Sequence, residues 1–526
     1  MGIKKISILF SILLLTFALV ACGNDDGKKE EGSKGTTENA KFKDTLNIAI
    51  TAQPPTLDSA MTVSSAALGI ALNVYEQLYV MDANYKPTPM LAESVKQSED
   101  GLTYTFKLRE GVKFHNDKEM TSEDVVASMN RWLVTSSRAK ALLEGAKFEV
   151  VDKYNVNLTV TQPTSDVMIL ISSKAQFAAI MPKEIVEAAP AEGVQEHIGT
   201  GPYKFEEWKQ DQYIHLVKNE AYQAVDIEPS GYAGRKDAPT KNLYYHFVTD
   251  HSTRIAGIQT GKYDVADSIP VENYDQLDAD KKVELSTFPG GSLTAFLNTS
   301  QGVLANEKYR QAILAALNNE DIMLASFAKP ELYSLAPGYM NANQEQWASE
   351  AGAELYNQGN QEKAKKLLKE AGYNGEEITL VTTKDYAEMY AATIVIQEQL
   401  RQIGMKVKVE NYDFPTFLET KNDPNKWDLF VASTGYQSTP PQLLAVTPDW
   451  AGLKNDEVKA SLAAIRSAAT PEDANKEWDK LQGFLYELGS STVIGHYNEV
   501  VALTNKIEGY EQFETSVVRS RGYTPP

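Results

Sequence analysis

Cys22 is the only cysteine in this chain of 526 residues, and it stands at the end of a short apolar run. Lys4 and Lys5 precede that run. Residues 6–20 are almost wholly apolar, about as long as the apolar part of a secretion signal and too short to span a membrane. Because the chain has only one cysteine, the exported protein cannot form an internal disulfide. Its stability must therefore come from a large hydrophobic core.

The residues around the cysteine, Leu19-Val20-Ala21-Cys22, resemble the lipobox of bacterial lipoproteins. In that motif the thiol receives a diacylglycerol and the peptide before it is removed. We therefore expect residues 1–21 to be a signal peptide and Cys22 to carry the lipid. The mature protein would then be anchored on the extracytoplasmic face of a bacterial cell membrane, on a Gram-positive surface. The alternative is an ordinary secretion signal followed by a chance cysteine.

The composition of the remaining chain fits that location. Residues 22–44 are rich in glycine, lysine and acids with a single aromatic side chain, which predicts a disordered tether with a reach of roughly 25 Å. The net charge of −20 argues against nucleic acids and anionic membrane surfaces as partners, because both need basic patches. Beyond the signal no apolar stretch approaches the length of a membrane span, so we expect membrane contact through the lipid alone.

The body of the chain mixes strands and helices. Residues 102–109 alternate large apolar and polar side chains, the period-two pattern of a half-buried strand. Residues 121–124, Thr-Ser-Glu-Asp, predict a capping box, because apolar side chains at helical spacing follow directly. Two further helices are expected over residues 309–317 and 364–371 from the same spacing.

A strand–helix–strand unit follows farther along the chain. Residues 378–382 predict a strand, residues 386–402 a helix that Gly404 ends, and residues 405–409 a second strand. A crossover of this length implies that the two strands pair in parallel with a right-handed connection. Open α/β sheets of this kind place ligands at the carboxyl ends of their strands.

Several segments in order resemble the oligopeptide/dipeptide solute-binding protein family, extracellular solute-binding protein family 5. They are Pro55-Thr56-Leu57-Asp58, Leu91-Ala92-Glu93-Ser94, Asp100 to Arg109 (DGLTYTFKLR), Gly111-Val112-Lys113-Phe114-His115, Ser122-Glu123-Asp124-Val125, Gly199-Thr200-Gly201-Pro202-Tyr203, Asn219-Glu220-Ala221-Tyr222, Arg310-Gln311-Ala312 and Trp427-Asp428-Leu429. No single segment is specific to this family. The ordered set of segments, which runs from about residue 45 to the C-terminus, is specific to it.

The resemblance implies an α/β fold of the two-lobed periplasmic-binding-protein type (type II, cluster C) with an extra domain inserted in lobe I. Two chain crossings, near Asn298 and His496, would form a hinge. The expected division is lobe I over residues 45–75, 199–297 and 496–526, the inserted domain over 76–198, and lobe II over 298–495. Gly199 and Gly201 would serve a tight turn where the chain passes between domains.

The resemblance also implies a function. The protein would be a monomeric receptor, without cofactor or catalysis, that captures a peptide between its lobes and delivers it to an ABC-type permease. Cytoplasmic ATPase subunits would drive that uptake, because the chain has no GxxxxGK[ST] motif of its own.

One segment departs from the family pattern. In similar proteins a Gly-Trp turn follows the strand that matches residues 429–432, and an acid three residues after the tryptophan holds the ammonium group of the peptide. Here Tyr436 replaces the aromatic residue and Thr439 stands where the acid would be. A hydroxyl is a weaker partner for a buried cation than a carboxylate. Either the ammonium group is held elsewhere, or the ligand is glutathione or another modified peptide. The nearest later acid, Asp449, is too far along the chain to occupy the turn.

Other candidates for ligand contact rest on their expected place in the fold. Strand ends and the approach to the hinge would supply hydroxyl and aromatic groups, which suit a peptide held mainly through its backbone. The full candidate set is Tyr436, Gln437, Thr439, Tyr386, Ser292, Thr294, Thr62 and Ser64, with Val63 and Leu293 beside them.

Three alternatives of other classes are weaker. Ser137 and Ser326 each begin a Ser-x-x-Lys pair, as in a surface hydrolase, but the companion motifs of penicillin-recognising enzymes are absent. His246 and His251 lack an accompanying ligand cluster, so no zinc site is expected. A receptor for a nickel chelate or haem on the same scaffold stays open, because fold does not fix the ligand.

Overall fold

The computed structural model describes residues 43–447, 451–468, 470–508, 511–513, 515–517 and 522–523. The chain divides into two units, Met1–Ala40 and Lys41–Pro526. The expected signal peptide, Cys22, nearly all of the tether and Asp449 lie outside the described residues, so lipidation stays a prediction. No helix of the described chain is both long enough and apolar enough to cross a membrane.

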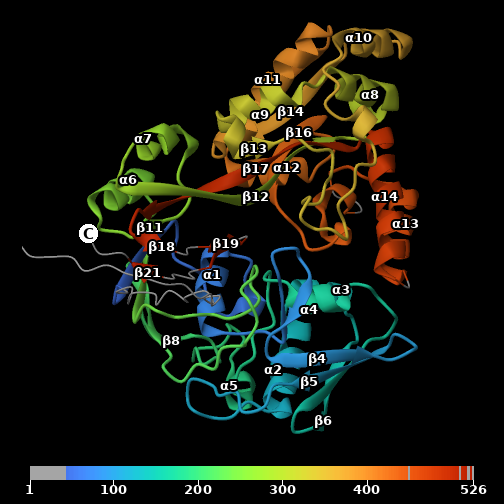
Figure 1. Ribbon diagram of the computed structural model, residues 1–526. Coiled ribbons are helices and arrows are strands. Elements are labelled where there is room, and N and C mark those ends of the chain that lie inside the picture. The colour runs from blue at the N-terminus through green and yellow to red at the C-terminus, as the bar shows by residue number, and fades with distance from the viewer. Residues whose placement is uncertain are drawn as a thin grey trace, which may run out of the picture. The chain divides into compact units, whose positions relative to one another are not determined.

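A mixed sheet of 11 strands runs through the second unit (Figure 1). Its order is β15-β14-β16-β12-β17-β11-β1-β10-β9-β8, with β13 paired to β17 beside this path. The strands are β1 (Thr45–Ile50), β8 (Tyr203–Lys209), β9 (Tyr213–Lys218), β10 (Asn242–Phe247), β11 (Val265–Ala266), β12 (Val283–Leu297), β13 (Tyr333–Ser334), β14 (Glu377–Thr383), β15 (Lys406–Tyr412), β16 (Leu429–Gly435) and β17 (Ser491–Thr504).

The expected strand–helix–strand unit is confirmed. Strands β14 and β15 pair in parallel, and the helix α11 (Ala387–Gln402) connects them. Strand β16 pairs in parallel with the other edge of β14. The carboxyl ends of β14, β15 and β16 therefore lie at one edge of the sheet, and Tyr436 follows directly on β16.

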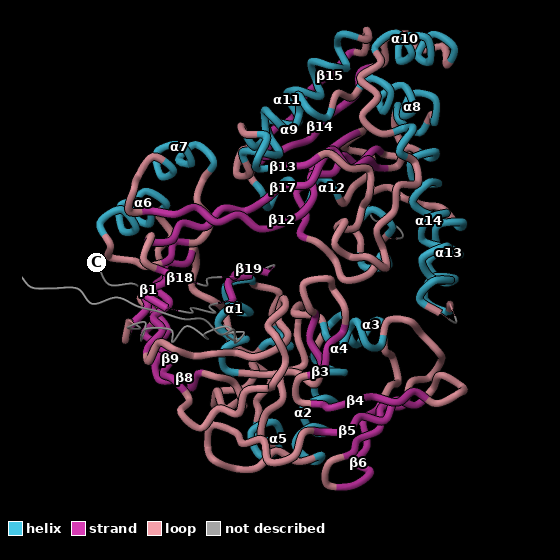
Figure 2. The backbone as a smooth tube through the Cα atoms, viewed as in Figure 1, coloured by secondary structure: helices cyan, strands magenta, loops and turns pink. Residues whose placement is uncertain are grey.

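Strands β12 and β17 join the two ends of the sheet. They lie side by side and pair antiparallel (Figure 2). The pairing runs from Val283 opposite Thr504 to Phe296 opposite Ser491, with register shifts between Pro289 and Gly291 and between Leu293 and Thr294. A Cβ atom at Gly290 would lie 2.5 Å from Cε2 of Tyr497. Only glycine permits that approach, so the irregular point of the strand pair is built into the sequence.

Three large hydrophobic clusters fill the described part of the second unit, beside a small fourth one around Val80 and Met90. One surrounds β1, β8–β10 and α1, one surrounds the four-stranded sheet β4-β5-β7-β6, and the largest surrounds β14–β16 and the helices α8–α14. We name the elements around them lobe I, the inserted domain and lobe II, in that order. The largest cluster also reaches into α6, α7 and β11. The residue limits expected for the three parts stay predictions.

The remaining elements have the following bounds. The helices of lobe I and the inserted domain are α1 (Ser65–Val74), α2 (Ser122–Thr135), α3 (Ser137–Leu142), α4 (Val167–Ser172), α5 (Lys183–Ala188), α6 (His251–Thr260) and α7 (Tyr274–Asp278). Those of lobe II, besides α11, are α8 (Glu307–Ala316), α9 (Asn319–Phe327), α10 (Gln361–Glu370), α12 (Phe414–Lys421), α13 (Asp456–Ser467) and α14 (Pro471–Leu488). The other strands are β2 (Tyr79–Met81), β3 (Pro87–Pro89), β4 (Ala92–Gln97), β5 (Thr103–Leu108), β6 (Lys147–Asp152), β7 (Asn155–Thr159), β18 (Ile507–Glu508), β19 (Glu511–Phe513), β20 (Thr515–Val517) and β21 (Gly522–Tyr523).

The local expectations hold in the inserted domain. Strand β5 buries Tyr104, Phe106 and Leu108 on one face. Helix α2 begins with a capping box, in which the Thr121 backbone N–H donates to Oδ2 of Asp124 at 3.0 Å. The expected helices over 309–317 and 364–371 correspond to α8 and α10.

Gly199 serves a purpose different from the expected tight turn. A Cβ atom there would lie 2.1 Å from the carbonyl oxygen of Val74, at the end of α1. The glycine is therefore required because another segment of backbone passes against it, and its own φ is not in the left-handed region.

Candidate functional site

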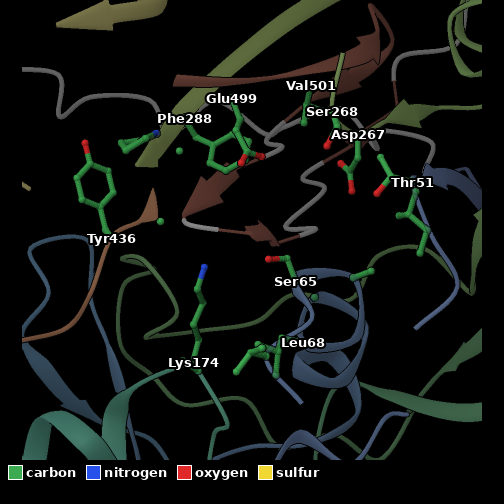
Figure 3. A pocket seen from close by; sticks show the side chains of 18 of the residues that line it. Thr51, Ser65, Leu68, Lys174, Asp267, Ser268, Phe288, Tyr436, Glu499 and Val501 are labelled. Atoms are coloured by element: carbon green, nitrogen blue, oxygen red, sulfur yellow. The ribbon is translucent and has the colours of Figure 1, made fainter. Parts of the chain in front are cut away.

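A cavity of about 350 Å³ lies where α1, β12, β16 and β17 approach one another (Figure 3). Its aromatic lining residues are Tyr436 after β16, Phe288 on β12, Tyr497 on β17 and Tyr245 on β10. Ser65 and Leu68, in the first turns of α1, lie on the opposite side. The cavity is thus bounded by elements of both lobes, as a ligand site between two lobes requires.

Charged groups of both signs line the same cavity. Lys174, after α4, points into it from the side of α1, whereas Glu499 on β17 reaches it from the opposite side (Figure 3). Arg138 of α3 and Asp267 after β11 also line it. Burial raises the pKa of Glu499, and the nearby positive charge of Lys174 opposes that shift. A cavity with an acid and a base on opposing walls is suited to a ligand that carries both charges.

Tyr436 is held in place by a histidine of the neighbouring strand pair. Its hydroxyl oxygen lies 2.9 Å from Nδ1 of His496, and the two rings stack with centroids 5.8 Å apart. Burial lowers the pKa of His496 to about 4 and raises that of Tyr436. Both side chains are therefore neutral at pH 7. Because the backbone near Gly338 stabilises a proton on the histidine, we assign the Tyr436 hydroxyl as the donor to Nδ1.

A second cavity, of about 250 Å³, lies on the other side of Tyr436. Pro289 and Tyr436 line both cavities, so they form the wall between them. The second cavity has a mixed lining, in which Ser334, Asn341 and Asn343 are among the polar side chains.

Direct contacts between lobe II and the inserted domain flank the first cavity. Arg138 Nη2 donates to Oε1 of Gln437 at 3.0 Å, and the hydroxyls of Ser438 and Ser173 lie 3.3 Å apart. These two pairs join the loop after β16 to the inserted domain beside Tyr436. They hold the two sides of the cavity together.

A second set of such contacts surrounds Arg466 on α13. Its Nε lies 3.0 Å from Oδ2 of Asp166, and its Nη2 donates to the carbonyl oxygen of Leu142 at 3.0 Å. The backbone N–H of Ser165 donates to the carbonyl oxygen of Arg466 at 3.0 Å. Asp166 is buried, and its own burial raises its pKa while Arg466 lowers it. The guanidinium of Arg466 therefore supports a charge that would otherwise be costly to bury.

Only some of the residues predicted from the sequence line the cavity. Of the eight candidates Tyr436 lines it, and Gln437 contacts Arg138, which also lines it. Val63, whose side chain is 65% exposed, is a further lining residue. Ligand contact by any of these residues stays a prediction.

The hydroxyls of Thr62 and Ser64 act on the local backbone. The Thr62 hydroxyl accepts from the Ser64 backbone N–H at 3.0 Å. Ser64 is the N-cap of α1, and its hydroxyl accepts from the backbone N–H of Ala67 in the first turn. These two residues therefore fix the start of α1, whose first turns reach the cavity.

Four other candidates lie off the cavity wall. Ser292 and Thr294 are buried in β12 with their hydroxyls 3.3 Å apart. Tyr386 is 41% exposed and packs against Phe414. Thr439 is 1% exposed, and its hydroxyl has no partner among the described residues. An acid at this position would therefore be enclosed by protein in the present structure.

Sequence reasoning missed the charged groups and three of the aromatic ones: Lys174, Arg138, Asp267, Glu499, Phe288, Tyr497 and Tyr245. The sequence contains one pattern that could have indicated part of this set. Tyr497, Glu499 and Val501 alternate along β17, so the period of a strand places all three on one face. Nothing in the sequence indicates that this face meets Lys174, which is more than 300 residues earlier in the chain.

The serine and histidine alternatives find no support in the geometry. The Ser326 hydroxyl donates to the carbonyl oxygen of Ile322, and Lys329 forms an ion pair of 2.6 Å with Asp275. The Ser137 hydroxyl donates to Gln176. Neither serine is paired with its lysine as a nucleophile. Within the described part of the chain, no group of three or more His, Cys, Asp or Glu residues is placed to hold a metal ion.

Comparison with known proteins agrees with the fold. Residues 86–447 match the family described as "Bacterial extracellular solute-binding proteins, family 5 Middle". The oligopeptide-binding protein AppA of Bacillus subtilis (strain 168) is 25% identical over 541 residues, which cover 95% of this chain and 94% of the relative. The glutathione-binding protein GsiB of Escherichia coli (strain K12) is 30% identical over 375 residues, which cover 70% of this chain and 69% of the relative.

The solved structure of the ABC transporter substrate-binding protein CtaP from Listeria monocytogenes has the same fold. Its TM-score is 0.79 at 23% identity, with 89% of this chain and 96% of that chain covered. The resemblance inferred from the motifs and the expected two-lobed α/β fold are therefore confirmed. The family match covers more than half of the chain, so this chain belongs to the bacterial extracellular solute-binding proteins of family 5, which are transport receptors rather than enzymes.

Proposed function

We propose that this protein is a lipid-anchored extracytoplasmic receptor that captures short peptides between its two lobes. It delivers them to an ABC-type permease for uptake. The anchor would be a diacylglycerol and a further acyl chain such as palmitate on Cys22, and the receptor would act as a monomer. Relatives named as oligopeptide-binding and glutathione-binding proteins support the ligand class.

The observation that carries the proposal is the cavity itself. Aromatic side chains and charges of both signs line about 350 Å³ of space between elements of the two lobes. Peptides are zwitterions with alternating apolar and polar parts, and this lining offers a partner to each part. Contacts across the opening, such as Arg138 with Gln437, would form as the lobes close on the peptide.

The size of the cavity favours short peptides. A sphere of this volume is about 9 Å across, and an extended chain advances at most ~3.3–3.6 Å per residue. Two to three residues therefore fill the cavity. A longer peptide would have to pass Tyr436 into the second cavity.

Glutathione is the second candidate ligand. It is a tripeptide of suitable length, and the relative named for glutathione binding is 30% identical to this chain. Its two carboxylates and one ammonium group would face the two bases and two acids of the cavity wall. A dedicated glutathione receptor and a general receptor for short peptides predict different competition results.

Native mass spectrometry on the full chain in mild detergent tests the proposal. The protein is offered an equimolar library of tripeptides together with reduced glutathione. We expect retention of one ligand per chain, without any change in ligand mass. Selective retention of glutathione from the mixture identifies the dedicated receptor. Failure to retain any member, or a change in ligand mass, would contradict the proposal.

A further inference from the structure

Each of the two lobes contains a buried arginine with the same kind of backbone contacts. Arg254 is the fourth residue of α6 and is 4% exposed, and Arg310 is the fourth residue of α8 and is 3% exposed. Each donates through Nη1 to the backbone carbonyl oxygens of the residues six and five positions earlier in the chain. A guanidinium carries its N–H donors in a planar fork, so it can join separate segments of backbone.

The fork of Arg254 joins the ends of two strands. Its Nη1 donates to the carbonyl oxygens of Val248 and Thr249, which follow directly on β10, at 2.7 and 3.1 Å. Its other nitrogen atoms reach the loop after β11. Nε donates to the carbonyl oxygen of Asp267 at 3.1 Å, and Nη2 donates to that of Ser268 at 3.0 Å. The arginine therefore ties the loop after β11 to the end of β10.

These strand ends form part of the cavity wall. Strand β1 pairs in parallel with both β10 and β11, so the carboxyl ends of all three lie at one edge of the sheet. Beyond the strands, the Val248 N–H donates to the carbonyl oxygen of Ile50 at 2.9 Å, and the Asp267 N–H to that of Ala49 at 3.0 Å. Ile50, Asp267 and Ser268 line the cavity of about 350 Å³ (Figure 3). Open α/β sheets bind ligands at this edge.

Ser268 has an uncommon backbone conformation. Its φ is +51°, in the left-handed region that few residues other than glycine, asparagine and aspartate adopt. Such a conformation costs free energy and persists where the surrounding structure holds it, often at functional sites. Arg254 binds the carbonyl oxygen of Ser268 on one side. On the other side the Ile269 N–H donates to the carbonyl oxygen of Val500 at 2.9 Å.

Arg310 provides the same contacts away from the cavity. Its Nε donates to the carbonyl oxygen of Leu488 at 2.9 Å, so it ties the start of α8 to the end of α14. Neither Arg310 nor any residue that accepts from it is among the described residues that line the two cavities beside Tyr436. The two arginines thus share their chemistry and burial but differ in their relation to the ligand site.

We propose that Arg254 is a positioning residue for ligand binding, which holds Asp267 and Ser268 in the turn that presents them to the cavity. This inference rests on the proposed function and assigns the residue that shapes one part of the binding wall. Without the guanidinium, Ser268 relaxes to an ordinary backbone conformation. The polar groups of both residues then move relative to the ligand, and affinity falls.

The test compares Arg254→Lys with its matched control, Arg310→Lys, in the full chain in mild detergent. Each substitution keeps the positive charge but replaces the planar fork by one ammonium group, which cannot join the same set of carbonyl oxygens. The ligands are an equimolar library of tripeptides and reduced glutathione. Retention in native mass spectrometry over a series of ligand concentrations gives the affinity, and urea denaturation gives the stability.

We expect both variants to lose stability to a similar extent, because both lose donors to buried carbonyl groups. Arg254→Lys should also bind the best-retained ligand at least about tenfold more weakly, because the unsupported strain opposes binding. Arg310→Lys should bind that ligand within about twofold of the native protein, because it acts far from the cavity. Native affinity in Arg254→Lys, or the same loss of affinity in both variants, would overturn the inference.

A second pair of variants tests the turn itself and decides the outcome if Arg254→Lys does not fold. Ser268→Gly and Ser268→Pro both remove the hydroxyl, but glycine accepts the left-handed conformation and proline excludes it. We expect Ser268→Gly to bind at least about tenfold more tightly than Ser268→Pro. Equal affinities in this pair would overturn the inference, although the proposed function would survive. A native protein that retains no ligand contradicts the proposed function, and the inference falls with it.

Discussion

The hydroxyl oxygen of Tyr436 lies 2.9 Å from Nδ1 of His496. Tyr436 forms part of the wall between the two cavities, and His496 lines the second one. Tyr436 follows the last strand of lobe II, and His496 lies on the strand that continues into lobe I. The bond therefore ties the ligand-facing aromatic ring to the long strand pair that joins the lobes. Its two partners are buried and neutral, so the bond persists across the physiological pH range.

Removal of the Tyr436 hydroxyl should reduce stability more than it reduces binding. Tyr436→Phe keeps the ring on the cavity wall but leaves Nδ1 of His496 without a donor. We expect the free energy of unfolding to fall by about 1–3 kcal/mol, as for other buried groups that lose their partner. Urea denaturation measures this loss. Tyr386→Phe is the matched control, because Tyr386 is 41% exposed and its loss should lie within about 0.5 kcal/mol. Equal losses in the two variants would contradict the assigned bond.

Acidification should destabilise the protein through its buried histidines. Burial lowers the pKa of His496, and likewise that of His115 and His197, to about 4, below the ordinary value of 6.5. Between pH 6.5 and 4 the unfolded chain therefore binds protons that the folded chain does not, so stability falls as the pH falls through this window. The stabilisation is fully present above pH 6.5, and each histidine contributes up to about 3 kcal/mol of it.

The variant His496→Gln tests whether this histidine makes stability fall as the pH falls. Melting temperatures measured from pH 4.5 to 7.5 should decline less steeply towards low pH in the variant than in the native protein. His251→Gln is the control, because His251 is exposed at the start of α6, and it should follow the native curve. A His496→Gln curve parallel to the native one would show that this histidine does not contribute.

The ion pair between Arg466 and Asp166 should favour the closed arrangement of the lobes. Arg466→Ala leaves the buried carboxylate of Asp166 without its cation and also removes the donor to Leu142. We expect peptide affinity to fall by about tenfold or more, mainly through faster dissociation. Calorimetry and stopped-flow fluorescence measure the two effects. Lys459→Ala on the same helix removes an exposed pair with Asp456 and should leave both unchanged. The same affinity in Arg466→Ala and the native protein would contradict this role.

Substitutions of Thr439 should show whether this residue is a buried structural residue or a ligand contact. Thr439→Val replaces a buried hydroxyl that has no partner among the described residues, so the free energy of unfolding should stay within about 1 kcal/mol or rise. Thr439→Asp would enclose a charge and should destabilise the protein by several kcal/mol without tighter peptide binding. The family pattern alone predicts the reverse, tighter binding by the restored acid. Chemical denaturation together with peptide titration decides between them.

The sequence predicted the fold better than the site, for physical reasons that particular residues illustrate. The unit over residues 378–409 was predictable because its helix and strands each satisfy a local period, and the crossover length then dictates parallel pairing. The capping box at Thr121 is likewise local. Tyr436 was predictable only through the resemblance. Glu499 and Lys174 were missed because their significance lies in a juxtaposition across the fold, and no local pattern encodes it.

Calorimetric titration of the full chain with alanine peptides of two to six residues tests whether the cavity beside Tyr436 captures short peptides. A cavity of about 350 Å³ predicts that affinity is highest for two or three residues and falls for longer chains. Affinity that continues to rise up to six residues would contradict capture in this cavity. The binding space would then extend past Tyr436.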